Sequence, residues 1–412
     1  MSKRGPTFLV AFMVALSATS YFDRTIMSIA GPSIMREFRI SETAMGTVYS
    51  AFLLSYTLMM IPGGWLSDRF GARNLLALSG LGAACCTALT ALCGNAEVAR
   101  WIGVVPSFLL IRFLFGIFAA PLYPSCARMA ANWIPASEQG RAQAFIISGA
   151  AIGAAISPIV FSRMMGAYGW RVSFCLAAAA TAILTGAWFA CVRDNPPGRE
   201  IRSQGPIEVR GWGGLFGNRQ LLTLTLAYFL LNYFEYIFFY WIYYYFGQIR
   251  HLGAAASANA TTVLFVMMAL MTPFGGWVSD RLVLRFGQKI GRRSVAMACM
   301  GVSAALLYLG AQDFGVFPTV ALLSLALGFA TASEGPFWAV VIEISGTDVG
   351  AAGGVLNMGG NLGGSLAPVL TPLLAARFGW SAGLYFGSFM VLLGVFTWLF
   401  VDPERKIEAP AG

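Results

Sequence analysis

The sequence predicts an all-α integral membrane protein with twelve transmembrane helices, arranged as two parallel six-helix repeats. Its composition, its long apolar runs and an internal repeat support this fold class. Of the 412 residues, 58% are hydrophobic and only 11% are charged, whereas soluble domains are about 45–50% apolar and about 25% charged. So few charges cannot cover so much apolar surface in water. The composition therefore excludes soluble, disordered and small disulfide-stapled proteins.

The apolar runs number twelve, and each is long enough to cross a bilayer, which takes about 20 residues in a helix. Barrel strands would be about ten residues long and would alternate in polarity, which these uniformly apolar runs do not. The runs lie at residues 8–35, 45–66, 74–94, 103–130, 141–164, 171–192, 220–246, 257–279, 293–312, 316–342, 350–376 and 380–401.

The longest polar stretch separates the sixth run from the seventh. Residues 193–219 are rich in Pro, Gly and charged side chains, a composition typical of a loop. We therefore expect an N-terminal six-helix bundle at residues 1–192, a cytoplasmic linker at 193–219 and a C-terminal six-helix bundle at 220–401. A cytoplasmic tail is expected at residues 402–412.

The distribution of basic residues predicts the orientation. With both termini in the cytoplasm, 18 of the 27 Lys and Arg residues lie in cytoplasmic segments and 7 in outer segments, while Arg24 and Arg112 lie within spans. This bias follows the positive-inside rule for a multi-pass protein of the cell (inner or plasma) membrane. It also accounts for the net charge of +9 without a nucleic-acid partner.

An internal repeat relates the two halves of the chain. The segment at 63–69 recurs 212 residues later at 275–281, and the segment at 153–158 is similar to residues 363–368, 210 residues later. Both copies have the same predicted membrane orientation, so the repeats are parallel about an axis along the membrane normal. In transporters built this way, the substrate site lies near the midplane between the halves.

These motifs carry a resemblance to a known family. The loop at 63–73 resembles the signature between the second and third helices of the major facilitator superfamily, and 275–293 is its degenerate copy. The resemblance implies a secondary transporter, not an enzyme, that moves a small organic anion by alternating access. Within the superfamily, the chain resembles the anion:cation symporter branch of galactonate, hexuronate, glucarate and phthalate permeases, through residues 21–38, 50–64, 112–135 and 353–368.

Ionisable side chains within spans are costly and are functional candidates by default. Asp23 and Arg24 are neighbours, about 100° apart around a helix, so they face different surroundings. The guanidinium fork suits bidentate carboxylate binding, and the resemblance associates arginines at the positions of Arg24 and Arg112 with anion binding or coupling. We expect both to bind the substrate anion; the alternative is structural pairing, for example of Asp23 with Arg112.

Three carboxyl groups are candidates for proton coupling. A substrate that occupies an arginine would release Asp23 to bind a proton. Many members of the resembling branch also carry a glutamate where this chain has Ala119, so coupling here uses fewer protons, another cation, exchange or a substitute carboxylate. Adding the repeat offset to Asp23 gives Glu235, a candidate substitute. Glu334 is the third candidate, with pairing to Arg112 or helix packing as the alternative.

Uncharged polar side chains complete the expected substrate site. Tyr21 and Tyr56 match tyrosines of the branch. Tyr236 lies in an aromatic-rich stretch whose hydroxyls can bind carboxylates, although an interfacial aromatic belt gives the same pattern. Asn361 is expected to donate to substrate or, alternatively, to bridge two helices.

The charges of the two repeated loops are expected to act in conformational gating. On the family resemblance, these charges form inter-helix contacts that stabilise the outward-open state; for the arginines, ordinary topology charge is the alternative. The residues are Asp68, Arg69, Arg73, Asp280 and Arg281.

Other function classes find less support in the sequence. We expect no metal site and no cofactor, because the seven Cys and the single His show no ligand spacing, and no nucleotide motif indicates ATP-driven transport. An exporter of drugs or organic cations, an anion exchanger or uniporter without proton coupling, and a receptor that has lost transport remain alternatives. The expected partners are a small organic anion, protons and the lipid bilayer, with a monomer as the transporting unit.

Overall fold

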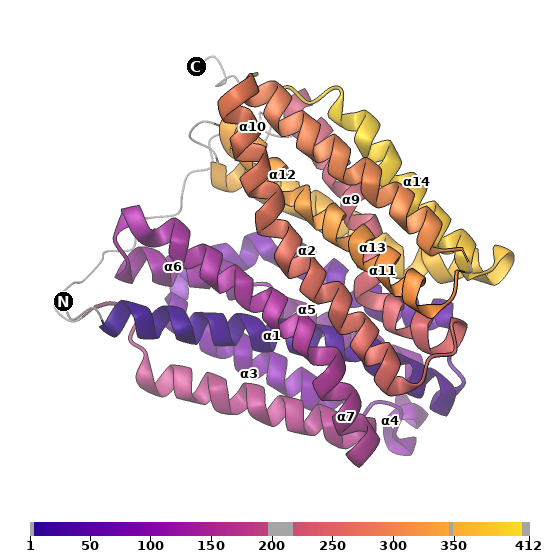
Figure 1. Cartoon of the computed structure of the whole chain (residues 1–412). Coiled ribbons are helices and arrows are strands. Elements are labelled where there is room, and N and C mark those ends of the chain that lie inside the picture. The colour runs from indigo at the N-terminus through magenta and orange to yellow at the C-terminus, as the bar shows by residue number, and fades with distance from the viewer. Residues whose placement is uncertain (1–3, 197–216, 313, 346–348, 406–412) are drawn as a thin grey trace. The chain divides into compact units, whose positions relative to one another are not determined.

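The computed structural model describes residues 4–196, 217–312, 314–345 and 349–405, and the regular elements in these ranges are helices (Figure 1). The chain divides into two compact units. The N-terminal unit comprises Met1–Ile207 with Ala254–Thr262, and the C-terminal unit comprises Glu208–Gly253 with Val263–Gly412. Most of the expected linker, residues 197–216, and most of the expected tail, residues 406–412, lie outside the described residues.

The described part of the N-terminal unit contains seven helices, α1 to α7. Helix α1 packs along α7. The last of them, α7, is two helices joined at Gly169, where φ is +76°. A glycine adopts this left-handed backbone without steric cost. The bounds are α1 (Arg4–Phe38), α2 (Glu42–Phe70), α3 (Ala72–Thr90), α4 (Ala96–Trp101), α5 (Val104–Ala119), α6 (Leu122–Trp133) and α7 (Ala136–Cys191).

The C-terminal unit repeats this plan with local differences. Helix α9 ends in a short π-helical segment, and α10 is broken at Gly287, where φ is +82°. The first residues of α10 belong to the N-terminal unit. The bounds are α9 (Arg219–Tyr244), η1 (Tyr245–Ile249), α10 (Ala254–Gly310), α11 (Val316–Ala332), α12 (Glu334–Ser345), α13 (Val349–Phe378) and α14 (Trp380–Trp398).

In the described ranges, nine helical segments are long and apolar enough to cross a membrane. Two of them, Glu138–Cys191 and Ala254–Gly310, are each long enough for two crossings and contain the breaks at Gly169 and Gly287. Helix α13 is not among the nine, although it has 30 residues. The composition and the helical structure together show a multi-pass membrane protein.

Two predicted runs are interrupted where the sequence alone suggested continuous helices. The run at 103–130 is divided between α5 and α6, with Pro121 as the residue before α6. Proline has no backbone N–H and is disfavoured inside a helix, so a new helix begins after it. The run at 316–342 is divided between α11 and α12 at Ser333.

Close helix contacts in both units depend on glycine. A Cβ at Gly153 of α7 would collide with the carbonyl oxygen of Ala18 in α1. In the same way, a Cβ at Gly363 of α13 would collide with the carbonyl oxygen of Phe229 in α9. Small residues let helix backbones approach closely in membrane proteins. These contacts fix the first helix of each unit, which carries the ionisable candidates Asp23 or Glu235.

Candidate functional site

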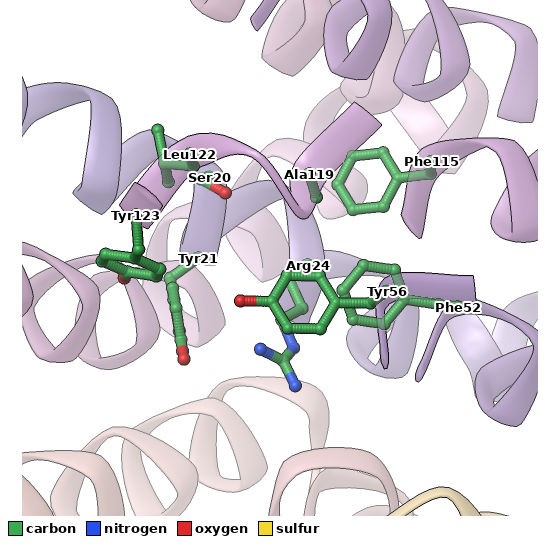
Figure 2. Close-up of a pocket in the computed structure, with 9 residues that line it drawn as sticks. All are labelled: Ser20, Tyr21, Arg24, Phe52, Tyr56, Phe115, Ala119, Leu122 and Tyr123. Atoms are coloured by element: carbon green, nitrogen blue, oxygen red, sulfur yellow. The ribbon is translucent and has the colours of Figure 1, made fainter. Parts of the chain in front are cut away.

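A pocket in the N-terminal unit is lined by residues of α1, α2, α5 and α6. Figure 2 shows Tyr21, Arg24 and Tyr56 together on one side of this pocket. The nine lining residues include one cation, no carboxylate and several hydroxyl groups. They are Ser20, Tyr21, Arg24, Phe52, Tyr56, Phe115, Ala119, Leu122 and Tyr123.

Arg24 is the charged member of the pocket. Its residue is only 5% exposed, and its guanidinium carbon lies 5.1, 4.9 and 5.6 Å from the ring centroids of Tyr21, Phe52 and Tyr56. A cation within about 6 Å of an aromatic face is attracted by the ring quadrupole. Three rings therefore hold the guanidinium in place within the pocket wall without neutralising its charge.

Asp23, the preceding residue, turns away from the pocket toward α7. The Thr181 hydroxyl donates to Asp23 Oδ2 at 2.7 Å, and Asp23 is 1% exposed. The other carboxyl oxygen, Oδ1, has no hydrogen-bond partner within the described part of the chain. The helix thus separates the acid from its basic neighbour, as the angle between adjacent residues requires.

Arg112 lies behind Arg24 and is not one of the pocket-lining residues. Its Nη2 donates to the backbone carbonyl oxygen of Arg24 at 3.3 Å. Its guanidinium carbon lies 5.2 Å from the ring centroid of Phe52 and 4.8 Å from that of Phe115. Arg112 also exerts an electrostatic attraction on Asp23. In this arrangement Arg112 supports the helix turn that carries Asp23 and Arg24.

The pocket contains side chains that the sequence did not single out, among them Ser20, Phe52, Phe115 and Tyr123. For some of them, the spacing in the sequence indicated a shared helix face. Phe52 precedes Tyr56 by four residues and Ser20 precedes Arg24 by four, which places each pair on one helix face. Thr181 had no comparable signal, because it lies far along the chain from its partner Asp23.

In the C-terminal unit, the acids Glu235 and Glu334 lie close enough to interact electrostatically. Glu235 is 5% exposed, and Glu334 is half-buried. The Tyr228 hydroxyl donates to Glu334 Oε1 at 3.2 Å. Glu235 comes from α9 and Glu334 from the start of α12, so the pair joins two helices.

The predicted polar residues Tyr236 and Asn361 are in direct contact. The Tyr236 hydroxyl donates to Asn361 Oδ1 at 3.0 Å, and Asn361 Nδ2 donates to Asn357 Oδ1 at 3.0 Å. The Tyr236 ring stacks on Tyr240, with ring centroids 5.9 Å apart. Asn361 therefore bridges α13 to α9, one of the two roles expected from the sequence.

The loop charges have different contacts in the two units. Asp280 Oδ1 binds Arg292 Nη1 at 2.6 Å, and Glu343 Oε1 binds Arg292 Nη2 at 2.9 Å. Arg281 lies over the ring of Trp277, with its guanidinium carbon 5.3 Å from the ring centroid. The sequence did not single out Arg292, which joins three parts of the C-terminal unit.

In the N-terminal unit the corresponding loop is held by backbone contacts. Arg73 Nη2 donates to the Phe189 carbonyl oxygen at 2.5 Å, and its backbone N–H donates to Asp194 Oδ1 at 2.8 Å. Arg69 lies 5.1 Å from the ring centroid of Trp65. The contacts of the Asp68 side chain are outside the described part of the structure.

The chain is similar to known transport proteins over nearly its whole length. A model of the Major Facilitator Superfamily matches residues 13–286 and 260–412. A probable sulfoacetate transporter of Cupriavidus necator is 27% identical over 422 residues, covering 98% of this chain and 95% of that protein. The hexuronate transporter of Bacillus subtilis is 27% identical, covering 98% and 96%. A D-galactonate transporter of Escherichia coli is 26% identical, covering 97% and 96%.

Solved structures with the same fold include a bacterial homologue of the human lysosomal transporter Spinster in an inward-facing, occupied conformation. It superposes with a TM-score of 0.83 at 14% identity and covers 97% of each chain. A D-xylose–proton symporter superposes with a TM-score of 0.73 at 18% identity, covering 97% of this chain and 99% of the symporter. At these identities the likeness shows the fold alone.

Proposed function

The chain belongs to the Major Facilitator Superfamily, which confirms the predicted family, and we propose that it imports a small organic acid together with protons. Membership of this family makes the protein a transporter rather than an enzyme. The relatives described above are named as transporters of sulfoacetate, hexuronate and galactonate. All three compounds are small anions with a carboxylate, which is the substrate class that we assign to this chain.

The observation that carries the proposal is the composition of the pocket wall. A buried cation, Arg24, stands among tyrosine and serine hydroxyls, with no carboxylate among the nine lining residues. Such a wall favours an anion, because a buried arginine stays protonated and its planar fork matches a carboxylate. An exporter of organic cations would be expected to line its pocket with acids instead.

The hydroxyl groups of the wall narrow the substrate class further. Tyr21, Tyr56, Tyr123 and Ser20 can each donate or accept a hydrogen bond. Sugar acids offer both a carboxylate for Arg24 and hydroxyls for these groups, whereas Phe52 can pack on an apolar part of the substrate. We therefore place sugar acids first and aromatic carboxylates second. Arg112, Tyr236 and Asn361 are proposed to support substrate binding, Arg112 by positioning Arg24.

Proton coupling is assigned to Asp23, Glu235 and Glu334. Asp23 adjoins the arginine that receives the anion, and Ala119 lines the pocket where the resembling branch often has a glutamate. The chain keeps protonatable groups instead in the Glu235–Glu334 pair, whose two like charges repel each other when both acids are ionised. The alternative without protons is exchange of one anion for another.

The membrane arrangement follows from the helix count. The nine long apolar segments become twelve crossings when the two broken at Gly169 and Gly287 count twice and α13 is added. An even number of crossings places both termini on one side, which the positive-inside rule identifies as the cytoplasm. We propose a monomeric protein of the cell membrane with bundles at 1–192 and 220–401.

Alternating access in this proposal uses the two units as moving bodies. Asp68, Arg69 and Arg73 on one loop, with Asp280 and Arg281 on the other, are assigned to stabilising one of the two access states. Their contacts with helix ends support this role, since Arg73 reaches the end of α7 and Asp280 reaches Arg292.

The test is uptake of labelled sugar acids, aromatic acids, neutral sugars and organic cations into proteoliposomes, with and without an inward proton gradient. We expect gradient-dependent accumulation of an acid by the wild type. Arg24→Gln should reduce kcat/KM for that acid by about 100-fold, because it removes charge-assisted hydrogen bonds of about 1.5–3 kcal/mol.

Arg24→Lys and Arg377→Ala serve as controls. Lysine keeps the charge but loses the fork, so it should recover part of the activity. Arg377 is exposed at the end of α13, so its removal should leave uptake near the wild-type level. Flux of cations or neutral sugars with no flux of acids would overturn the proposed substrate class. Acid exchange that does not depend on the proton gradient would contradict proton coupling and leave the substrate class in place.

A further inference from the structure

We infer that Thr181 is a positioning residue for proton transfer, whose hydroxyl serves both the ionised and the protonated form of Asp23. The inference deepens the proposed proton symport and rests on it for its transport consequence. It concerns a residue on α7, beyond the break at Gly169, that the sequence did not single out.

The geometry gives the Thr181 hydroxyl two possible acceptors. Thr181 Oγ1 lies 2.7 Å from Asp23 Oδ2 and 3.1 Å from the carbonyl oxygen of Ala177, one turn earlier on the same helix. Both side chains are buried, with Thr181 4% exposed and Asp23 1% exposed. Water is therefore a poor substitute for this contact.

A hydroxyl has one proton to donate and two lone pairs that accept. When Asp23 is ionised, the Thr181 proton points to Oδ2 and stabilises the carboxylate. When Asp23 takes up a proton on Oδ2, the new O–H donates to Thr181 Oγ1, and the Thr181 proton turns to the Ala177 carbonyl. Each state keeps its hydrogen bonds after the rotation of one hydroxyl, so neither helix has to move when the proton arrives or leaves.

The charged and titratable groups around Asp23 do not replace its hydrogen bond with Thr181. From α5, Arg112 attracts Asp23 electrostatically, and its Nη2 donates a hydrogen bond to the backbone carbonyl oxygen of Arg24. On α3, Cys86 is a titratable group that also interacts with Arg112. From α2 and α6, Tyr56 and Tyr123 face the pocket, where they line the wall together with Arg24 on α1.

Thr181 also has a consequence for the anion site. The hydrogen bond holds the carboxyl group of Asp23 against α7, away from the pocket wall that Arg24 lines. The same hydrogen bond thus serves two purposes, since it prepares Asp23 for proton exchange and leaves the pocket wall free of a carboxylate.

The experiment is an infrared titration of the Asp23 carboxylic acid band in the purified full-length protein. The band is identified by its loss in Asp23→Asn. Thr181→Val keeps the branched shape but removes the hydroxyl. It should shift the midpoint of the Asp23 band to higher pH by about one unit, because the hydrogen bond to the ionised carboxylate is stronger than the one to the neutral acid. Thr181→Ser keeps the hydroxyl and should remain close to the wild type.

Several outcomes decide the inference. A shift in Thr181→Val that Thr181→Ser does not show supports it, and Thr181→Ala provides the same measurement if the valine variant does not fold. An unchanged or lowered midpoint in the folded variants overturns it. Because the titration needs no transport, a wild type without proton-driven uptake would refute the proposed symport while the titration still decides the role of Thr181.

Discussion

The two units each carry an acid within their first helix, α1 or α9, and surround it differently. In the N-terminal unit, Asp23 accepts a hydrogen bond from Thr181 and lies near two arginines, Arg24 and Arg112. In the C-terminal unit, Glu235, 212 residues later, contacts a second acid, Glu334. One unit therefore surrounds its acid with positive charge, and the other places a second acid beside it.

The backbone packing, in contrast, is repeated closely. Gly153 approaches the Ala18 carbonyl in one unit, and Gly363 approaches the Phe229 carbonyl in the other. The loops turn at Gly71 and Gly287, with φ of +83° and +82°. The repeat thus preserves the contacts that hold the helices together, while the charges around the acid of the first helix differ: arginines lie near Asp23 and a second acid lies near Glu235.

The largest expected effect comes from removing the acid of the N-terminal unit. Asp23→Asn should retain acid exchange but lose proton-driven accumulation, because an amide cannot bind and release the coupled proton. Accumulation and exchange in proteoliposomes measure the two activities separately. Normal accumulation by this variant would show that the coupled proton does not pass through Asp23.

The second effect concerns the acidic pair of the C-terminal unit. Glu235→Gln and Glu334→Gln should each lower the accumulation ratio by about tenfold per pH unit of gradient, which is the contribution of one coupled proton. The double variant should lose no more than either single one, since we assign one coupled proton to the pair. Equal accumulation in the wild type and both single variants would confine coupling to the N-terminal unit.

A smaller effect tests whether the packing is equivalent in the two units. Gly153→Ala and Gly363→Ala should each destabilise the folded protein by about 1–3 kcal/mol, because the added methyl group meets a backbone carbonyl. Thermal unfolding in detergent measures this. Gly186→Ala and Gly301→Ala are matched controls, since nothing lies within 4 Å of a Cβ there, and they should be neutral or stabilising by up to about 1 kcal/mol.

The smallest effect concerns the end of the C-terminal unit. A hydrogen bond and charge attraction from Lys289 lower the pKa of Asp402, against an opposing effect of burial. A lowered pKa in the folded state means that the stabilisation is present above the unfolded-state pKa and is lost as pH falls through the folded-state pKa.

Asp402→Asn should therefore cost about 0.2–1 kcal/mol at neutral pH and nothing at a pH below the folded-state pKa. Thermal unfolding of the variant and the wild type across this range measures the difference. A cost that persists in acid would mean that Asp402 acts through packing rather than through its charge.

The sequence by itself determined the membrane class, the approximate helix positions, the internal repeat and the family. These properties are one-dimensional: about 20 apolar residues in a row suffice to predict a span, and a repeated motif is recognised without coordinates. The sequence also showed that Asp23 and Arg24 face different directions, because adjacent residues on a helix always do.

The tertiary structure decided what each of these side chains faces. The contact between Asp23 and Thr181, the pairing of Glu235 with Glu334, and the place of Arg112 behind Arg24 rather than in the pocket wall all join helices that are far apart in the chain. Helical periodicity gives a direction around an axis but not the neighbour on that side, because the neighbour depends on how closely glycines such as Gly153 and Gly363 allow the helices to approach.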